Sequence, residues 1–319
     1  MNGYATVGVL RGEILAHGAF LQMNPESEVN MKSVVVRAVT TGAVGAVLFF
    51  SMMSPGQAFD GRTDMLKLNS GNFSHPLSID NKWMPLKPGT QMVFTGSKIN
   101  EEDREQPYEL VLTITDLVKE IQGIESAVVL EQYFTKHKLE ISGLAFRAQD
   151  NVGNVWLLGE AKEFFDENVK LIGARMWAAG LRGSRAGISI PAKPAKGMAS
   201  YSSGFVDAPY SLNDRGQVRA TGAKVKVPAG SFDQVLVTEE GSKPVGPHAR
   251  PVEVKYYAPG VGYVKVNWAG KDPGKNRLEL AKIKQLSAQE MDQVRDDALA
   301  IEERAAYYGR TTEPPWQAK

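Results

Sequence analysis

The sequence predicts a mainly β protein: a large, curved antiparallel sheet, as a half-barrel or an open barrel, followed by an amphipathic C-terminal α-helix. Three observations predict this fold. Short runs rich in Val, Leu, Ile, Phe and Tyr fill residues 84–286, and several of them alternate apolar and polar residues. Gly, Pro and Asn separate the runs, as turn residues do. Strand-like and helix-like segments do not alternate, which excludes a parallel α/β sheet and leaves a β-sandwich as the alternative.

The composition is that of a soluble globular protein with one large domain or two ordinary ones. The chain has 319 residues, of which 43% are hydrophobic and 23% charged, and a formal net charge of +1. The absence of cysteine excludes disulfides, a Cys-ligated metal site and a cysteine nucleophile. Nucleic-acid binding is not expected, because it requires a concentrated positive face.

Residues 31–58 have the three-part layout of a secretory signal peptide. Two basic residues precede the uncharged run 39–53, and Gly56 and Ala58 occupy the −3 and −1 positions of an A-x-A-like cleavage site. The uncharged run is shorter than the roughly 20 residues that cross a bilayer as a helix. We therefore expect a secreted or periplasmic protein with no membrane span after cleavage. An uncleaved anchor or a buried helix is the alternative.

A signal peptide normally begins near the initiator, so residues 1–30 need a separate explanation. We interpret them as an upstream extension that follows from a start codon assigned too early. In this interpretation translation begins at Met31.

Residues 59–286 are expected to form the antiparallel β domain, with about eleven strands that mostly pair with their neighbours in sequence. The clearest runs are 91–96, 108–115, 126–134, 155–160, 224–227, 232–240, 252–258, 262–270 and 277–286. Asp150–Asn154 has the composition of a hairpin turn, in which Gly153 takes a positive φ. Pro259 and Gly260 predict a second hairpin turn.

Residues 287–309 predict an amphipathic helix. Ser287 and Glu290 form a capping box, and Gly309 ends the segment. Apolar residues recur at steps of three and four, so the helix is expected to pack on a sheet face or to plug an open end of the barrel. The alternative is that it docks a protein partner. Residues 310–319 are expected to be a loose tail.

Motifs of known catalytic chemistry are missing from the sequence. His75, His137 and His248 lie too far apart for the usual metal-ligand spacings, so we expect surface positions, no metal site and no cofactor. Neither a GxSxG nucleophile elbow nor an SxxK pair occurs. The small-residue segments 183–184 and 202–204 are interpreted as turns.

Paired carboxylates are the chemistry that remains open to an enzyme, because a glycosidase needs only two. The first candidates for catalysis are Asp150, Glu160 and Glu239. Glu160 ends an apolar strand, where burial raises the pKa of a carboxyl group. Ordinary structural roles in turns and at strand ends are the alternative for all three.

Aromatic residues on or beside the predicted strands are candidates for ligand binding. Some of them should face the concave side of a curved sheet, where rings with a few polar neighbours usually line a pocket. The candidates are Trp156, Trp177, Tyr201, Tyr256, Tyr257 and Trp268. A position in the hydrophobic core is the alternative for at least half of them, and the adjacent Tyr256 and Tyr257 should face opposite sides.

Several segments carry a resemblance to known proteins. A family of secreted bacterial proteins of unknown function resembles this chain in residues 85–96, 148–160, 227–240 and 252–266. The VPAGSF and YYAPGVG pieces are also similar to periplasmic proteins related to the lipoprotein-carrier half-barrel, which implies an antiparallel sheet with a hydrophobic concave face. Family members usually carry an acidic residue and two aromatics before residue 148. Here those positions are Ala145, Phe146 and Arg147, so a site built around them is expected to be altered.

Three functions fit these observations. The first is an exported envelope or periplasmic binding or carrier protein that holds an apolar or amphipathic small molecule or lipid in the curved sheet. The second is a secreted hydrolase or lyase that uses paired carboxylates. The third is an accessory component of a secreted complex, with the C-terminal helix as its docking element. The lack of catalytic motifs favours the first function over an enzyme.

Overall fold

The computed structural model describes residues 66–100, 102–206, 212–241, 252–269 and 276–308. The predictions for residues 1–30, the signal peptide 31–58, His248 and the tail 310–319 lie outside the described residues.

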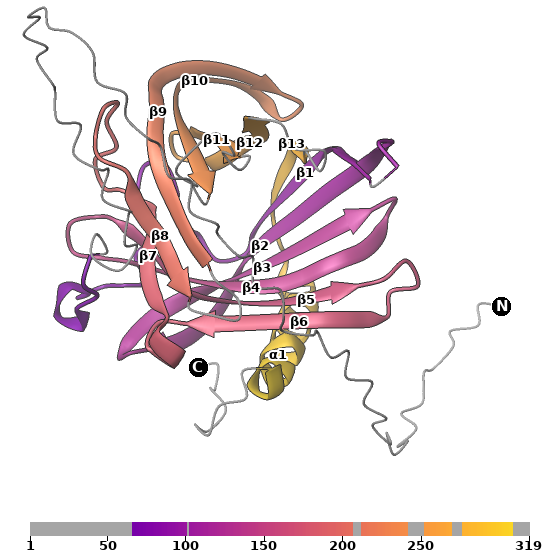
Figure 1. Cartoon of the computed structure of the whole chain (residues 1–319), viewed down its shortest axis with the longest axis horizontal. Coiled ribbons are helices and arrows are strands. Elements are labelled where there is room, and N and C mark those ends of the chain that lie inside the picture. Colours follow the sequence, from indigo (N-terminus) through magenta and orange to yellow (C-terminus); the bar gives the residue numbers. More distant parts are fainter. Residues whose placement is uncertain (1–65, 101, 207–211, 242–251, 270–275, 309–319) are drawn as a thin grey trace, which may run out of the picture. The chain divides into compact units, whose positions relative to one another are not determined.

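Thirteen strands of the described residues form one antiparallel sheet (Figure 1). They are β1 (Thr90–Ile99), β2 (Glu105–Ile121), β3 (Ile124–Thr135), β4 (Lys138–Gln149), β5 (Val155–Phe165), β6 (Leu171–Ala178), β7 (Arg185–Ile190), β8 (Tyr201–Val206), β9 (Leu212–Val227), β10 (Gly230–Gly241), β11 (Val252–Ala258), β12 (Gly262–Ala269) and β13 (Arg277–Gln285). Twelve of them close into a barrel in the order β4-β3-β2-β1-β13-β12-β11-β10-β9-β8-β7-β5, and β5 returns to β4. The remaining strand, β6, pairs with the second half of β5.

The predicted half-barrel or open barrel is therefore wrong, because the sheet closes on itself. The difference arises from strands that the sequence did not reveal. β7 and β8 complete the ring between β5 and β9, but their sequences RAGISI and YSSGFV are rich in small residues with weak strand preference. Residues 202–204 accordingly lie within β8 and not in a turn.

Both predicted hairpin turns are confirmed. Asp150 Oδ1 accepts hydrogen bonds from the backbone N–H of Val152 at 3.1 Å and of Asn154 at 2.9 Å, and Gly153 has a φ of 95°. This turn lets β4 pair with β5 along its length, from Gln149 to Ile141. Gly260 has a φ of 74° in the turn between β11 and β12.

Helix α1 (Ala288–Tyr308) packs on the outer face of the barrel, against β2, β4, β5 and β6 (Figure 1). The capping box is confirmed, since the Ser287 N–H donates to Glu290 Oε2 at 2.9 Å and the Glu290 N–H donates to Ser287 Oγ at 3.3 Å. The apolar stripe of the helix consists of Met291, Val294, Ala298, Ile301 and Ala305, and it is buried against outward-facing strand residues. Of the two predicted arrangements, packing on a sheet face is thus confirmed.

Ion pairs reinforce this contact. Arg304 Nε lies 2.6 Å from Glu163 Oε1 on β5, and Arg295 Nη2 lies 2.6 Å from Asp116 Oδ2 on β2. Lys119 and Glu302 form a buried pair between β2 and the helix. In the part of the chain that the structure describes, no helix has the length and apolar character that spanning a bilayer requires.

The segment that precedes β1 enters the barrel. Gln149 Oε1 accepts hydrogen bonds from the backbone N–H of Asp80 at 3.1 Å and of Asn81 at 2.8 Å, which fixes the segment to β4. Trp83 and Met84 are buried in a cluster with Ile79, Val155, Ile190, Val218, Leu236 and Tyr257. We call residues 79–86 the plug, because they fill part of the barrel with apolar side chains.

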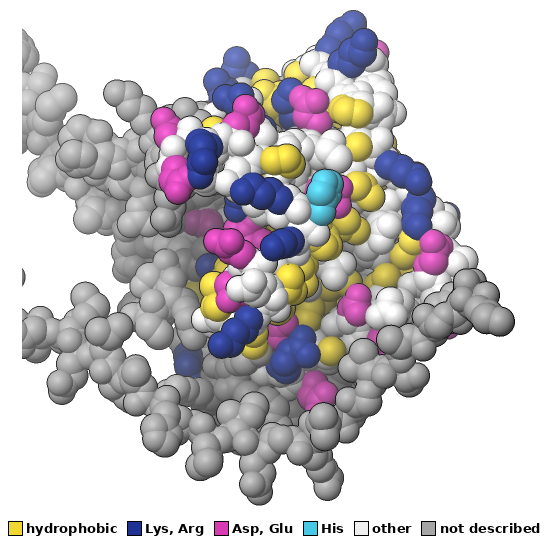
Figure 2. Space-filling view, turned by 90° about the vertical axis from the view of Figure 1, so that its right-hand side faces the viewer, with side chains coloured by type: hydrophobic (Ala, Val, Ile, Leu, Met, Phe, Trp, Pro, Cys, Tyr) yellow, Lys and Arg dark blue, Asp and Glu magenta, His cyan; other side chains and the backbone are white. Residues whose placement is uncertain are grey.

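The turn between β9 and β10 contacts β13, which is not its neighbour in the sheet. The Ala229 N–H donates a hydrogen bond to the Leu280 carbonyl at 2.9 Å. Figure 2 shows Lys and Arg side chains interspersed with Asp and Glu over the described part of one face, with hydrophobic side chains between them.

Candidate functional site

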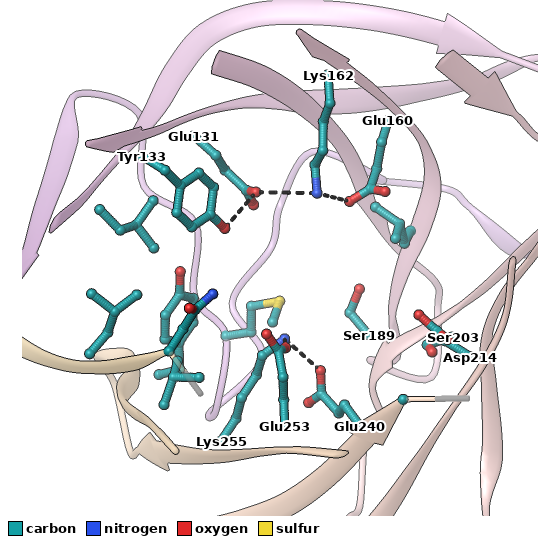
Figure 3. Close-up of a pocket in the computed structure, with 18 of the residues that line it drawn as sticks. Glu131, Tyr133, Glu160, Lys162, Ser189, Ser203, Asp214, Glu240, Glu253 and Lys255 are labelled. Carbon is teal, nitrogen blue, oxygen red and sulfur yellow. Dashed lines mark hydrogen bonds and ion pairs between the residues drawn. The ribbon is translucent and has the colours of Figure 1, made fainter. Parts of the chain in front are cut away.

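The barrel contains a partly open cavity of about 530 Å³ (Figure 3). Every strand except β1 contributes to its lining, and Met84 of the plug borders it. The volume falls within the roughly 300–1,000 Å³ that is usual for small-molecule sites. The charged lining residues are the carboxylates Glu131, Glu160, Asp214, Glu240 and Glu253 and the cations Arg147, Lys162, Arg175 and Lys255. At neutral pH this lining carries a formal charge of −1.

One cluster of charges lies on β3, β4 and β5. Lys162 Nζ is 3.0 Å from Glu160 Oε1 and 3.9 Å from Glu131 Oε2. Arg147 Nη2 is 3.8 Å from Glu131 Oε1, and Arg147 Nη1 donates to Ser189 Oγ at 2.5 Å. We call Glu131, Arg147, Glu160 and Lys162 the β5-side cluster.

These contacts keep Glu160 and Lys162 ionised. Burial alone would raise the pKa of Glu160, but the charge and hydrogen bond of Lys162 and the hydrogen bond from Trp177 Nε1, at 3.2 Å, lower it to about 2. Burial would likewise lower the pKa of Lys162, yet Glu160 and Glu131 raise it above its ordinary value. Both groups are therefore charged at neutral pH.

A second cluster lies across the cavity on β10 and β11 (Figure 3). Lys255 Nζ is 2.8 Å from Glu240 Oε2 and 3.0 Å from Glu253 Oε2. The hydroxyls of Tyr257 and Thr238 each donate to Glu240 Oε1 at 2.8 Å. We call Glu240, Glu253 and Lys255 the β11-side cluster.

Partners again outweigh burial in the β11-side cluster. Burial would raise the pKa of Glu240, but Lys255, Tyr257 and Thr238 lower it. Burial would lower the pKa of Lys255, whereas Glu240 and Glu253 raise it well above its usual range. Glu240 and Lys255 are therefore also charged at neutral pH.

A bulge in β5 brings Glu160 into the cavity. Leu157 pairs with Arg147, and Gly159 pairs with Phe146, so Leu158 is an extra residue in the ladder. In a regular strand Leu157 and Glu160 would face opposite sides, but both line the cavity. At Gly159 an added Cβ would lie 2.6 Å from the Trp177 carbonyl oxygen, so the close approach of β6 requires glycine.

Five neutral hydrogen-bonding groups of the lining have no hydrogen-bond partner among the described residues. They are the hydroxyls of Tyr108, Tyr263 and Ser203, the amide of Asn276 and the indole N–H of Trp268. Burial raises the pKa of both tyrosines, so their hydroxyls stay protonated. These groups are available to a ligand, because no described side chain occupies them.

The structure places the three catalytic candidates in different surroundings. Glu160 lines the cavity. Asp150 lies in the β4–β5 turn. Its Oδ2 accepts hydrogen bonds from Asn154 Nδ2 and Trp156 Nε1, each at 2.8 Å, so its carboxylate stabilises the turn. Glu239 is absent from the lining and lies 3.3 Å from Arg219 Nη1 on the neighbouring β9. The three candidates are thus not brought together.

Of the aromatic candidates, Tyr257 and Trp268 line the cavity. Trp177 is not part of the lining; it pairs with Glu160 in the β5–β6 ladder and donates a hydrogen bond to its carboxylate. Tyr256 belongs to apolar packing beside Val254 and not to the lining, so the two adjacent tyrosines face opposite sides as expected.

The two remaining aromatic candidates have structural surroundings. Trp156 packs edge-on against Phe73, with ring centroids 6.0 Å apart, in the cluster beneath α1. Tyr201 covers Gly216, where an added Cβ would lie 2.3 Å from its ring, and its buried hydroxyl has no partner among the described residues.

Sequence reasoning missed most of the charged lining. Glu131, Arg147, Lys162 and Lys255 were not proposed as site residues. Polar residues two positions apart in a strand, such as Glu253 and Lys255, would have indicated a polar face, because such pairs share one face of the strand.

A metal centre finds no support in the described segments, which contain no group of three or more His, Asp or Glu side chains arranged to hold an ion. His75 and His137 are exposed, as expected.

No protein-family model and no curated protein matches the sequence. A crystal structure from Bacteroides fragilis, described as an exported protein with a YmcC-like fold, matches 64% of this chain and 99% of its own, with 14% identity and a TM-score of 0.37. A structure described as a lipoprotein from Parabacteroides distasonis covers the same shares, with 14% identity and a TM-score of 0.34. At these values the likeness assigns no function, and the resemblance to secreted and lipoprotein-carrier families stays a prediction.

Proposed function

We propose that the protein is an exported binding protein that holds a small ligand inside the closed barrel. The observation that carries the proposal is the cavity of about 530 Å³, whose lining includes hydrogen-bonding groups with no partner among the described residues. Among these groups the Trp268 indole N–H is buried, and a buried donor without a partner costs about 1–3 kcal/mol, so a compensating ligand or water is favoured there.

The lining favours a polar or amphipathic ligand over the wholly apolar one that the sequence also allowed. Two clusters of paired acidic and basic side chains face each other across the cavity (Figure 3). Apolar side chains such as Leu110 and Leu278 cover another part of the wall. A hydrocarbon chain alone would leave the charged side chains without hydration, which is costly.

Export is the second part of the proposal, and it rests on the signal-peptide pattern of residues 31–58. Intact-mass measurement of the protein recovered from its host tests it. We expect a mature chain that begins at Phe59, after cleavage at Ala58. A mature chain that still contains residues 31–58 would contradict export by this route.

A carboxylate-dependent hydrolase is the second candidate, because Glu131 and Glu160 lie together in the cavity. General acid catalysis needs a carboxyl group that holds its proton near neutral pH, whereas partners lower the pKa of Glu160 and Glu240. That opposes this candidate. Turnover in a panel of glycoside and ester substrates that disappears in Glu160→Gln, but not in Glu239→Gln, would favour it.

The accessory role would require a different surface from the one first expected. The apolar stripe of α1 is occupied by the barrel, so a protein partner would have to contact the polar outer side of the helix around the exposed Leu299. The cavity inside the barrel has no place in that role.

Ligand recovery tests the binding proposal. The protein is purified from its own host, denatured, and its released small molecules are identified by mass spectrometry. We expect one compound class at near-stoichiometric amounts from wild type, and its loss in Ser203→Trp, whose indole would fill the cavity. Ser231→Trp is the matched control, because Ser231 is an exposed residue at the start of β10. Equal recovery from both variants, or none from wild type, would contradict binding in the cavity.

A further inference from the structure

We propose that the ligand of the cavity is an uncharged, hydroxyl-rich molecule, that is, a saccharide; this deepens the proposed binding function and rests on it. The basis is that the lining contains two kinds of polar group. The charged side chains of the two clusters are paired with one another, whereas the groups without partners are neutral hydroxyls, an amide and an indole N–H.

The paired charges disfavour an ionic ligand. An anion at Lys162 or Lys255 would have to compete with Glu160 or Glu240, which lie 3.0 and 2.8 Å away. Breaking a largely buried pair leaves an uncompensated charge, which is strongly unfavourable. Arg175 is the exception; it is exposed, and it stacks over Phe164 at 5.6 Å.

The neutral groups fit hydroxyl groups, which both donate and accept. The Tyr108 and Tyr263 hydroxyls and the Asn276 amide can likewise do both. Trp268 Nε1 is a buried donor that needs an acceptor, and a sugar hydroxyl or ring oxygen supplies one.

The carboxylates contribute without losing their partners. An ionised carboxylate has about four lone-pair sites, so Glu131 and Glu253 can accept from a hydroxyl while each keeps its contact with a lysine. A hydrogen bond to an ionised acceptor is stronger than one between neutral groups. A ligand rich in hydroxyls can use several such oxygens at once.

Aromatic side chains complete the fit. Tyr263 and Trp268 belong to the same strand, and Tyr263 stacks on Phe94, with ring centroids 4.8 Å apart, which holds it in place. Ring faces pack against the C–H groups of a pyranose, which bury apolar area, while polar groups at the ring edge bind hydroxyls.

Titration calorimetry on the full exported protein tests the ligand class. The probes are maltotriose, cellotriose and triacetylchitotriose as neutral saccharides, trigalacturonic acid as an acidic one, dialanine as a zwitterion and lauric acid as an apolar chain. A glycan array extends the neutral and acidic sets. We expect binding of a neutral saccharide and at least tenfold weaker binding of its acidic counterpart.

Matched variants locate the binding. Tyr263→Phe and Trp268→Phe each remove a hydrogen-bonding group of the cavity and keep a ring, so each should weaken binding of the saccharide by about fivefold. Tyr256→Phe, which removes a hydroxyl outside the lining, should leave the affinity unchanged. An equal loss in all three would contradict binding at this site.

The other outcomes separate the two proposals. If dialanine, lauric acid or trigalacturonic acid binds in the cavity and no neutral saccharide of the array does, the saccharide assignment is overturned and the binding function stands. If no probe binds and no small molecule is recovered from the host protein, both are overturned.

Discussion

The two faces of strands β3, β4 and β5 differ in chemistry. The outer face, beneath α1, carries the fully buried apolar residues Leu130, Leu144, Phe146 and Leu158. The inner face of the same strands carries the charged residues Glu131, Arg147, Glu160 and Lys162. In most closed barrels the apolar residues point inward. Here the helix makes the outer face a core, which frees the inner face for polar groups.

The two faces therefore differ in what they contribute: the outer face to stability and the inner face to ligand binding. The outer face buries apolar surface, which is the main stabilising contribution to a fold. The inner face holds charges whose pairing offsets their desolvation and adds little net stability. We therefore expect substitutions on the outer face to act on unfolding, and substitutions on the inner face to act on ligand affinity as well.

The largest contrast is expected at two neighbouring leucines. Leu158→Ala removes a fully buried side chain beneath α1 and should lower the free energy of unfolding by about 3 kcal/mol. Leu157→Ala truncates a half-buried side chain of the cavity wall and should cost about 1 kcal/mol. Urea titrations of both variants measure the difference. A larger loss at Leu157 would mean that the interior, and not the helix side, is the main core.

Two lysines compare how much ion pairs inside and outside the barrel contribute to the free energy of unfolding. Lys255→Met leaves Glu240 and Glu253 without their shared cation and should destabilise the fold by about 3 kcal/mol. Lys265→Met, on the adjacent strand, breaks the more exposed pair with Glu279 and should cost less than about 1 kcal/mol. Thermal unfolding at equal ionic strength compares them. Similar losses would show that the inner cluster is as well hydrated as the outer pair.

Acid should reveal the depressed pKa of Glu160. Its pKa is about 2 in the fold, below the ordinary carboxyl value near 4.3. The stability it contributes is therefore complete above about pH 5 and is lost as the pH falls toward 2, by about 3 kcal/mol. In Glu160→Gln the free energy of unfolding should fall less steeply over this range. Glu239→Gln is the control, and a wild-type slope in Glu160→Gln would contradict the assignment.

The sequence predicted the strands that have apolar runs, because their alternation reflects burial of one face. The expectation that Tyr256 and Tyr257 face opposite sides is confirmed. The alternation could not say which face lies inside, and without β4, β7 and β8 an open sheet was the natural expectation. Which face of a strand contacts the helix and which lines the cavity depends on the tertiary structure.

The site was predicted only where a strong local signal existed. Tyr257, Trp268 and Glu160 were named because they are aromatic or end an apolar strand. Glu131 of β3 and Lys162 of β5 meet across the intervening strand β4, in a register that a bulge in β5 helps to set, and no single-strand pattern contains it.

The central claim is that the inside of the barrel, and not its helix-covered face, receives the ligand. The most direct measurement is the indole N–H spectrum of protein labelled with ¹⁵N-tryptophan, before and after addition of the small-molecule fraction released from host-purified protein. The Trp268 indole, which has no partner among the described residues, should shift strongly. The Trp156 indole, which is bonded to Asp150 on the outer side, should not move. A shift at Trp156 with none at Trp268 would contradict the account.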